Sequence, residues 1–277
     1  MFFKELYRYR HLLREVVVKN IKIQYRHSVL GVVWTLLEPL LTTLVLVFVF
    51  GRLFGAGRLT QDPNIINFPI YLLCGRLLFH FFSQSTKRAM KSMKQSASII
   101  KKVRVPKFIY PVANVLSHFV SLMISMIVLV GFVLFFVFAA SERNPAPILG
   151  WNLLLAPVPL LILFILSTGV GLIVSTLAVF FKDVEYLYSV FCMVLFYATP
   201  IFWSPATMGD PSPDGGLMTM LNANPLYAII EMFRDSVLRG QTIQLQHLLY
   251  ALVFALVVFV VGIWVFQRKQ NEFILHI

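Results

Sequence analysis

The few side chains that could do chemistry are dispersed along this sequence, and none forms a recognisable catalytic set. No Gly-Lys dipeptide occurs, so the chain has no phosphate-binding loop and does not itself hydrolyse ATP. The zinc pattern HExxH is absent, and no large polar loop carries the clustered carboxylates and histidines of a glycosyltransferase. Asp183 and Glu185 in FFKDVEY could bind a metal ion, but a surface turn contacting a partner is favoured. We therefore predict no catalytic residue, no metal site and no cofactor in this chain.

Glu38 is the one acidic residue inside the long apolar run 29–54, and Pro39 follows it directly. A charge near the centre of a bilayer costs about 2.5–3.5 kcal/mol, so such a residue normally faces a partner or a hydrated cavity. Pro39 also removes a backbone donor and disturbs the preceding turn. Two roles stay open for Glu38: a place on a substrate pathway, or a structural pair with Arg76. That pair would need a long reach, because the estimated depths differ by about 12 Å at 1.5 Å per residue.

A basic segment follows the second apolar run and has a methionine-rich helical face. That face is formed by Met90, Met93, Ala97 and Ile100, with Lys87, Lys91, Lys94 and Lys101 around it. Such a short helix, at about 87–102, suits docking into a groove of a partner protein. The alternative is a basic loop that lies on anionic lipid.

Aromatic residues gather where the fifth apolar run ends, in YATPIFWSP. Pro200 and Pro205 stop a regular helix there. The aromatic residues are Tyr197, Phe202 and Trp203. They could form an ordinary interfacial belt, or a stacking surface for sugar rings at an exit. The later stretch NPLYAIIEMFRDSVLRG predicts a helix of about 15 residues, too short to span, so we expect a re-entrant or membrane-surface helix.

The composition indicates that the elements carrying these residues lie in a membrane. Apolar residues make up 58% of the 277 positions and charged residues 13%, whereas soluble domains have about 25% charged residues. We predict an all-α integral membrane fold with six transmembrane helices near 29–54, 65–86, 108–140, 151–181, 186–203 and 247–267. Residues 1–28 carry one apolar and one basic stripe, each at steps of three and four, and predict an amphipathic interface helix. This leaves 29–277 as the six-span transmembrane domain.

The basic residues indicate the orientation of the chain. The segments before span one, after spans two and four, and after span six hold 18 of the 24 Lys and Arg residues. The positive-inside rule therefore predicts that both termini are cytoplasmic. Because the basic residues flank apolar spans, the net charge of +12 does not point to nucleic acid. Both cysteines, Cys74 and Cys192, lie in apolar runs, so no disulfide framework is implied.

Three segments carry a family resemblance: QYRHSVLGVVWTLLEPLL, VRVPKFIYPVANVL, and YATPIFW followed by NPLYAIIEMFR. In this order they resemble the permease family of bacterial ABC exporters that move O-antigen, capsule and teichoic-acid polymers. The resemblance covers essentially the whole chain. It implies a homodimer in the plasma membrane of a bacterium, with two copies of a separate ATP-binding subunit that holds ATP and Mg²⁺.

The resemblance also implies roles for particular segments. It places a coupling helix at about 87–102, re-entrant helices at about 205–240, and a channel lined by spans one and five. By position, the substrate pathway is then assigned to Trp34, Glu38, Tyr197, Phe202 and Trp203. Coupling to the ATPase is assigned to Lys87, Met90, Lys91, Met93, Lys94, Ala97 and Ile100. Lys22 and Arg26 suit a cytoplasmic opening that accepts a diphosphate-linked lipid.

Two other functions fit parts of the sequence. An exporter of drugs or small lipids would share the fold but would have a short, closed cavity. A membrane enzyme acting on polyprenyl-phosphate sugars would share the substrate chemistry, but it needs a catalytic acid–base set that the sequence lacks. The sequence therefore favours the translocation of a lipid-linked polymer.

Overall fold

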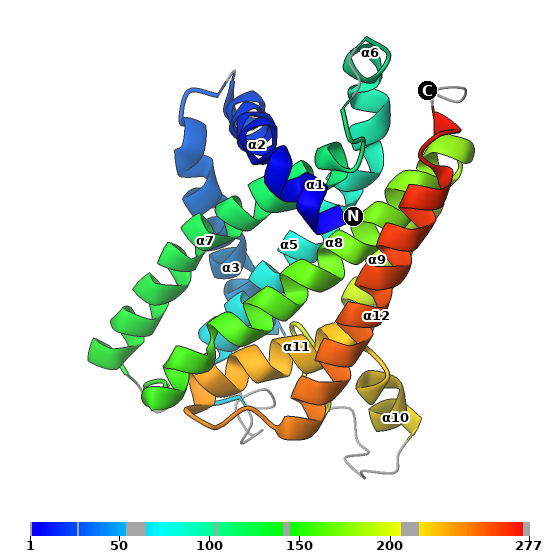
Figure 1. Cartoon of the computed structure of the whole chain (residues 1–277). Helices are drawn as coiled ribbons and strands as arrows, with labels where there is room; N and C mark the ends of the chain where they lie inside the picture. The colour runs from blue at the N-terminus through cyan, green and yellow to red at the C-terminus, as the bar shows by residue number, and fades with distance from the viewer. Residues whose placement is uncertain are drawn as a thin grey trace.

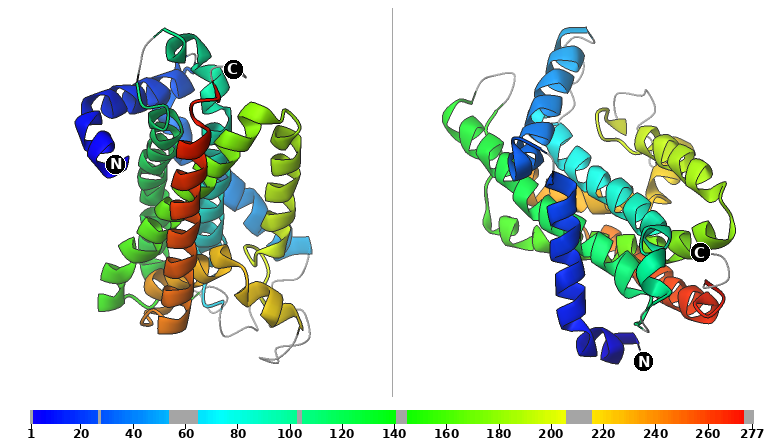
Figure 2. Two further views of the ribbon diagram at one scale, coloured as in Figure 1. Left: turned by 45° about the vertical axis from the view of Figure 1, so that its right-hand side comes forward. Right: turned by 90° about the horizontal axis from the view of Figure 1, so that it is seen from above.

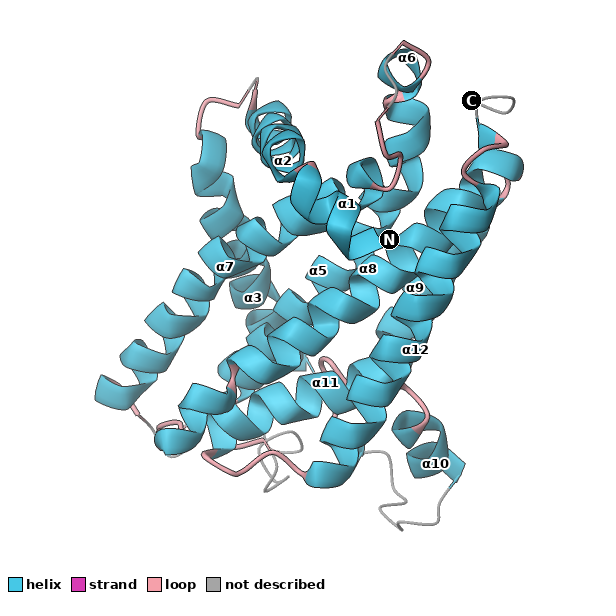
Figure 3. Cartoon of the chain, viewed as in Figure 1, coloured by secondary structure: helices cyan, strands magenta, loops and turns pink. Residues whose placement is uncertain are grey.

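The computed structural model describes residues 2–26, 28–53, 65–102, 105–140, 145–205 and 216–273. Within these ranges every regular element is a helix (Figure 3). In chain order the helices are α1 (Phe2–Arg8), α2 (Arg10–Tyr25), η1 (Gly31–Val33), α3 (Trp34–Leu53), α5 (Phe68–Gln95), α6 (Ala97–Ile100), α7 (Ile109–Phe138), η2 (Trp151–Leu155), α8 (Pro157–Phe180), α9 (Val184–Ala198), α10 (Gly216–Asn222), α11 (Pro225–Arg234), η4 (Asp235–Arg239) and α12 (Leu245–Lys269). The all-α prediction is confirmed for the described part of the chain.

Four of these helical stretches are long and apolar enough to cross a membrane. Over the described ranges they are Gly31–Phe50, Ile109–Phe138, Trp151–Phe180 and Leu245–Lys269. They coincide with the first, third, fourth and sixth predicted spans. A helix that is apolar all round requires lipid or protein on every side. The chain is therefore a multi-pass membrane protein.

The second and fifth predicted spans differ from those four. α5 continues without a break from its apolar half into the basic segment and ends at Gln95, so the helix predicted at 87–102 is mostly its extension. Only α6, four residues long, is separate from it. α9 has 15 residues, which corresponds to about 22 Å at 1.5 Å per residue. It is thus shorter than the roughly 30 Å hydrocarbon core of a bilayer.

α5 is the central helix of the fold. It begins at Asn67, whose side chain accepts a hydrogen bond from the backbone N–H of Ile70 at 3.2 Å, and Pro69 occupies the first turn. Both are typical of a helix start, because the first N–H groups lack partners within the helix. α5 packs against α3, α7, α8, α9 and α11 (Figure 1). This position makes α5 the element that relates the others to one another.

The remaining helices lie at the two ends of the bundle. Figure 2 shows α1 and α2 lying across the end that also holds α6 and the C-terminus, and we call this the α6 end. Lys107 lies there and donates a hydrogen bond to the carbonyl of Gln270, which links the start of α7 to the end of α12. Burial lowers the pKa of Lys107 below its ordinary value. α10 and α11 lie at the opposite end, which we call the α11 end.

The α11 end holds the short helices between α9 and α12. Asn224 caps α11 by accepting from the N–H of Leu226 at 3.0 Å, and its amide donates to Thr199 at 2.9 Å. η4 ends at Gly240, whose φ of 62° favours glycine. The predicted segment 205–240 thus contains two short helices and the turn of η4, while its residues 206–215 lie outside the described ranges.

α8 and α12 approach each other at two glycines. A Cβ atom added to Gly169 would lie 2.7 Å from backbone atoms of Phe259, and one added to Gly262 would lie 2.5 Å from the carbonyl oxygen of Gly169. Small residues let two membrane helices come close enough for their backbones to touch. The α8–α12 packing therefore depends on the absence of side chains at both positions.

We predict that Gly169→Ala destabilises the fold by about 1–3 kcal/mol, because overpacking a close helix contact costs this much. Thermal unfolding of the purified protein in detergent measures the effect as a lower midpoint. Gly131→Ala in α7 is the matched control, since a Cβ added there meets nothing within 4 Å. Equal midpoints for the two variants would show that the α8–α12 contact is not close.

Candidate functional site

A polar cavity of about 250 Å³ lies among α2, α3, α5 and α7. Its ionisable lining residues are Glu38, Arg76, His80, Arg88 and His118. Gln24, Tyr25, Trp34, Thr35, Gln84, Ser121 and Ser125 also line it. Polar side chains inside a helix bundle of this kind mark a functional region, because each of them is costly to place in lipid.

Pro39 explains how α3 is held at this cavity. A proline has no N–H, so the carbonyl of Thr35, four residues earlier, loses its partner within the helix. The hydroxyl of Ser125 on α7 donates to that carbonyl at 3.0 Å. The Thr35 side chain lies 2.5 Å from the hydroxyl of Tyr25 at the end of α2. The break at Pro39 is thus repaired by neighbouring helices, which fixes α3 against both.

Glu38 is a lining residue with a specific neighbour. Its carboxylate lies 3.7 Å from Nε2 of His80 on α5. Arg76, one turn away from His80, donates to the carbonyl of Pro39 at 3.3 Å. The structure thus brings Glu38 and Arg76 into one cavity, but Arg76 bonds to the backbone beside Glu38.

The other residues predicted for this region lie in two separate places. Trp34 begins α3, lines the cavity and is 44% exposed. Lys22 and Arg26 lie on the exposed side of α2 and line a shallow surface hollow of that helix. They do not line the cavity that contains Trp34 and Glu38. His80 and His118 were not identified from the sequence, although a titratable residue inside a predicted apolar run was the available signal. Arg88, which was also not identified, lies just after the second predicted run.

The aromatic residues after α9 separate into two environments. Tyr197 is 61% exposed, whereas Trp203 is buried and packs with Leu221 and Tyr227. Phe202 lies between them and stacks on Phe50 of α3, with ring centroids 5.2 Å apart. Tyr197 is therefore accessible, Phe202 joins the ends of α3 and α9, and Trp203 belongs to the core. A pathway role for these residues stays a prediction.

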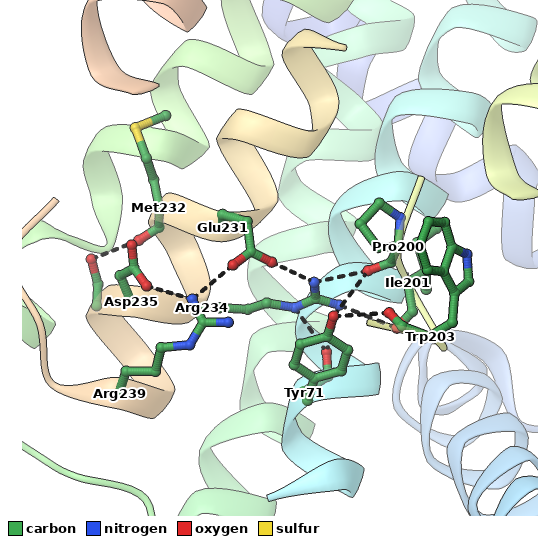
Figure 4. A network of polar contacts seen from close by, with 10 residues as sticks. Tyr71, Pro200, Ile201, Trp203, Glu231, Met232, Arg234, Asp235 and Arg239 are labelled. Atoms are coloured by element: carbon green, nitrogen blue, oxygen red, sulfur yellow. Dashed lines mark hydrogen bonds and ion pairs between the residues drawn. The ribbon is translucent and has the colours of Figure 1, made fainter. Parts of the chain in front are cut away.

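Arg234 of α11 holds the segment that carries Phe202 and Trp203 (Figure 4). Its side chain is fully buried, and it donates to the carbonyl oxygens of Pro200 at 2.8 Å and Ile201 at 3.1 Å. It also donates to the carbonyl of Tyr71 on α5 at 3.2 Å and lies over the Tyr71 ring. Arginine suits this place because its planar group offers five donors in a fixed arrangement.

Carboxylates balance the charge of this network. Glu231 accepts from Arg234 at 2.8 Å and from Arg239 at 2.7 Å, and Asp235 accepts from Arg239 at 2.6 Å. Two cations and two anions thus form one buried cluster. A cluster without net charge avoids the large cost of an unpaired ion away from water.

Room for Arg234 comes from a glycine. A Cβ atom added to Gly75 of α5 would lie 2.7 Å from the Nη2 atom of Arg234. The sequence predicted charges in this segment but not that Arg234 is buried. A single sequence cannot show that Gly75 of α5 lies next to Arg234 of α11.

The predicted coupling residues also divide between core and surface. Met90 and Met93 are 1% and 0% exposed, and Ile100 is buried as well. The prediction of a methionine face open for docking is therefore corrected: Met90 belongs to a buried cluster with residues of α8 and α9, and Met93 to a buried cluster with residues of α7, α8 and α12. The amphipathic pattern was recognised, but its apolar face turns toward the chain's own helices. Lys91 is exposed, Lys94, Lys87 and Ala97 are half-buried, and Lys101 and Lys102 are exposed around α6.

A comparison with known protein families identifies the family of this chain. Residues 11–238 match the family described as ABC-2 type transporter. The chain belongs to this family. An ABC-2 permease forms the membrane part of an ABC transporter, and the ATP-binding subunit is a separate chain. The absence of a nucleotide-binding loop is thus in keeping with the membership.

Individual relatives cover nearly the whole chain. An O-antigen export system permease protein RfbA of Klebsiella pneumoniae is 28% identical over 95% of this chain and 93% of its own length. The protein of the same name from Myxococcus xanthus is 26% identical over 98% and 96%. A polysialic acid transport protein KpsM of Escherichia coli is 23% identical over 92% of both chains.

We predict that Arg234→Met destabilises the protein by about 3 kcal/mol or more, because it leaves buried carbonyls without a donor and removes one of the two arginines that balance Glu231 and Asp235. Arg234→Lys should recover little, since an ammonium cannot reach several acceptors in the same plane. The unfolding midpoint in detergent is the measurement. Arg268→Met, at an exposed arginine on α12, is the control and should change stability by at most about 0.5 kcal/mol. A stable Arg234→Met variant would contradict the structural role of the network.

Proposed function

We propose that this chain is the channel-forming subunit of an ATP-driven exporter that moves a lipid-linked surface polysaccharide across the cytoplasmic membrane. The observation that carries the proposal is the polar cavity among α2, α3, α5 and α7 in a chain of the ABC-2 family. The relatives named for O-antigen export and polysialic acid transport support a polysaccharide as cargo. Teichoic acid is a further cargo of the same physical kind.

The chemistry of the cavity suits such a cargo. A sugar chain presents hydroxyl groups, which amide and hydroxyl side chains such as Gln24 and Gln84 can bind. Trp34 offers an aromatic face for a sugar ring, while Arg76 and Arg88 suit the phosphates of a lipid carrier. A purely apolar drug would bind weakly to this lining, because it cannot form hydrogen bonds with the polar side chains. The cavity therefore favours a polar, anionic substrate over a small apolar one.

Six spans and a dimer complete the proposed assembly. α5 and α9 are the second and fifth spans, with α9 continued by residues Thr199–Trp203, and α11 enters the membrane from the outer side without crossing it. α3 and α9 expose large apolar residues, which include Phe48, Tyr186, Phe191 and Tyr197. A second copy covering these faces would enclose a taller channel than one chain can. Tyr197 and Phe202 would then lie near its exit.

The orientation follows from charge. The α6 end holds the basic residues of α2, the end of α5 and the end of α12 (Figure 2). The positive-inside rule places this end in the cytoplasm, with both termini. α6, with Lys101 and Lys102 exposed beside it, is then available to two copies of the ATP-binding subunit, which hold ATP and Mg²⁺.

Purification from native membranes tests the assembly and the cargo together. We expect an ATP-binding protein to co-purify with this chain in equal amounts, and lipid-linked polysaccharide to stimulate its ATP hydrolysis. Deleting the chain should leave lipid-linked polymer on the cytoplasmic side of the membrane. A complex stimulated by small apolar compounds, with polymer export intact in the deletion strain, would refute a polymer cargo.

We predict that Trp34→Ala lowers polymer export about tenfold, which corresponds to about 1.4 kcal/mol, within the usual range for an aromatic contact. ATP hydrolysis should stay within about twofold of the parent. Quantifying polymer on the cell surface and ATPase activity in membranes measures both. Trp151→Ala is the matched control, because Trp151 is 89% exposed on η2 and is not among the residues that line the cavity. Equal export by the two variants would remove Trp34 from the pathway.

A further inference from the structure

An ion pair joins the two helices that meet at the α6 end of the bundle. Nζ of Lys94, in the last turn of α5, lies 2.8 Å from Oε1 of Glu185 in the first turn of α9. Nζ of Lys91 lies 3.9 Å from the other carboxylate oxygen. Lys94 and Glu185 are each about one-third exposed or less, at 34% and 26%. Lys94 lies two residues before Ser96, which occupies the N-cap position of α6.

The same face of α9 makes further contacts with α5. Tyr188 donates a hydrogen bond to Oγ1 of Thr86 at 2.7 Å, and it packs with Met90. The ring of Phe196 lies 5.2 Å from that of Phe79. Positions 185, 188, 192 and 196 repeat at steps of three and four, so they form one stripe along α9. This stripe runs along α5 from its end back toward its middle.

The other faces of α9 have little support within the chain. Tyr186, Leu187, Val190, Phe191, Val194 and Tyr197 are all more than half exposed. The described contacts of α9 are thus concentrated on α5 and the adjoining part of α8. A displacement of the end of α5 therefore has a direct route to α9.

The ion pair differs in kind from the apolar contacts. Apolar side chains can slide past one another at small cost, because their attraction has no direction. A charged hydrogen bond of 2.8 Å has a defined geometry and resists such sliding. Lys94–Glu185 and Tyr188–Thr86 are thus the contacts that fix the register of α9 on α5.

We propose that Lys94 and Glu185 are positioning residues that transmit to α9 an ATP-driven movement of the α5–α6 tip, by which we mean the last turn of α5 together with α6, residues 92–100. This rests on the proposed function, since it requires the ATP-binding subunit to act on the α6 end. The pair keeps α5 and α9 in register, so the two helices move as one body during the transport cycle. Without the pair, ATP is hydrolysed and the α5–α6 tip moves, but α9 no longer follows this movement.

A thiol on the exposed face of α9 reports this movement without reference to cargo. Val194→Cys places it at a position that is 61% exposed in the single chain, on the α9 face that would line the water-filled channel of the proposed dimer. The native Cys74 and Cys192 are buried and provide only a slow background. The full complex with its ATP-binding subunit, in membrane vesicles, is labelled with a maleimide in the presence and absence of ATP. The ratio of the two labelling rates measures the response of α9.

We expect Glu185→Lys and Lys94→Glu each to reduce the ATP-dependent change in labelling at least fivefold. In Glu185→Lys, ATP hydrolysis should stay within twofold of the parent. Glu185→Gln, which keeps the shape, should reduce the change in the same direction. Combining Lys94→Glu with Glu185→Lys should restore it to within twofold, because the pair is rebuilt with reversed charges. A purely local role in folding would not give this rescue together with retained ATP hydrolysis.

The matched control is Glu272→Lys. Glu272 pairs with Lys269 at 3.0 Å, within the C-terminal segment at the same end of the bundle. Its reversal should leave the labelling change intact. The proposal is overturned if Glu185→Lys retains the full change, if the exchanged pair fails to restore it, or if α9 shows no ATP-dependent change in the parent. A normal labelling response in vesicles that translocate no polysaccharide would refute the proposed cargo and leave this link standing.

Discussion

A guanidinium group that water cannot reach must find all its acceptors inside the protein, and Arg234 does so at the α11 end of the bundle. Its donors reach the carbonyls of Pro200, Ile201 and Tyr71, and its charge is balanced by Glu231. One side chain thereby joins α11, the segment after α9, and α5. Because a buried cation without these partners would be very costly, the three elements cannot separate independently. The need to satisfy this buried arginine therefore fixes the relative positions of the three elements at the α11 end.

The same requirement acts on the backbone at the cavity. Pro39 leaves the Thr35 carbonyl without a helical partner, and Ser125 of α7 supplies one at 3.0 Å. Arg76 of α5 donates to the carbonyl of Pro39 itself at 3.3 Å. Interruptions of regular helix in a membrane are tolerated where neighbours bond the freed groups. In this protein those interruptions therefore hold α3 against α5 and α7, so the features that weaken one helix strengthen its contacts with others.

The sequence predicted most of the helices because hydropathy depends on local residues alone. The apolar runs of α7, α8 and α12 are uninterrupted, and their positions agree with the prediction to within a few residues. Contacts between distant segments have no such local signal. The amphipathic pattern around Met90 and Met93 was identified, but a pattern cannot tell whether its apolar face meets a partner or the chain's own α8. The meeting of Glu38 with His80, and the burial of Arg234, likewise depend on how α5 is packed.

The central place of α5 connects the two ends of the molecule. At the α11 end, the carbonyl of Tyr71 accepts a hydrogen bond from Arg234. In the middle of α5, Arg76 and His80 line the cavity. At the α6 end, Lys94 forms an ion pair with Glu185. α9 is thus tied to α5 near both of its ends, directly through Glu185 and indirectly through Pro200 and Arg234. A helix of 28 residues transmits displacement along its axis with little loss, because each turn is hydrogen-bonded to the next. A change at α6 that moved α5 would therefore displace the cavity lining and both ends of α9 together. Such a joint displacement is what a transporter needs in order to open one internal cavity first to one side of the membrane and then to the other.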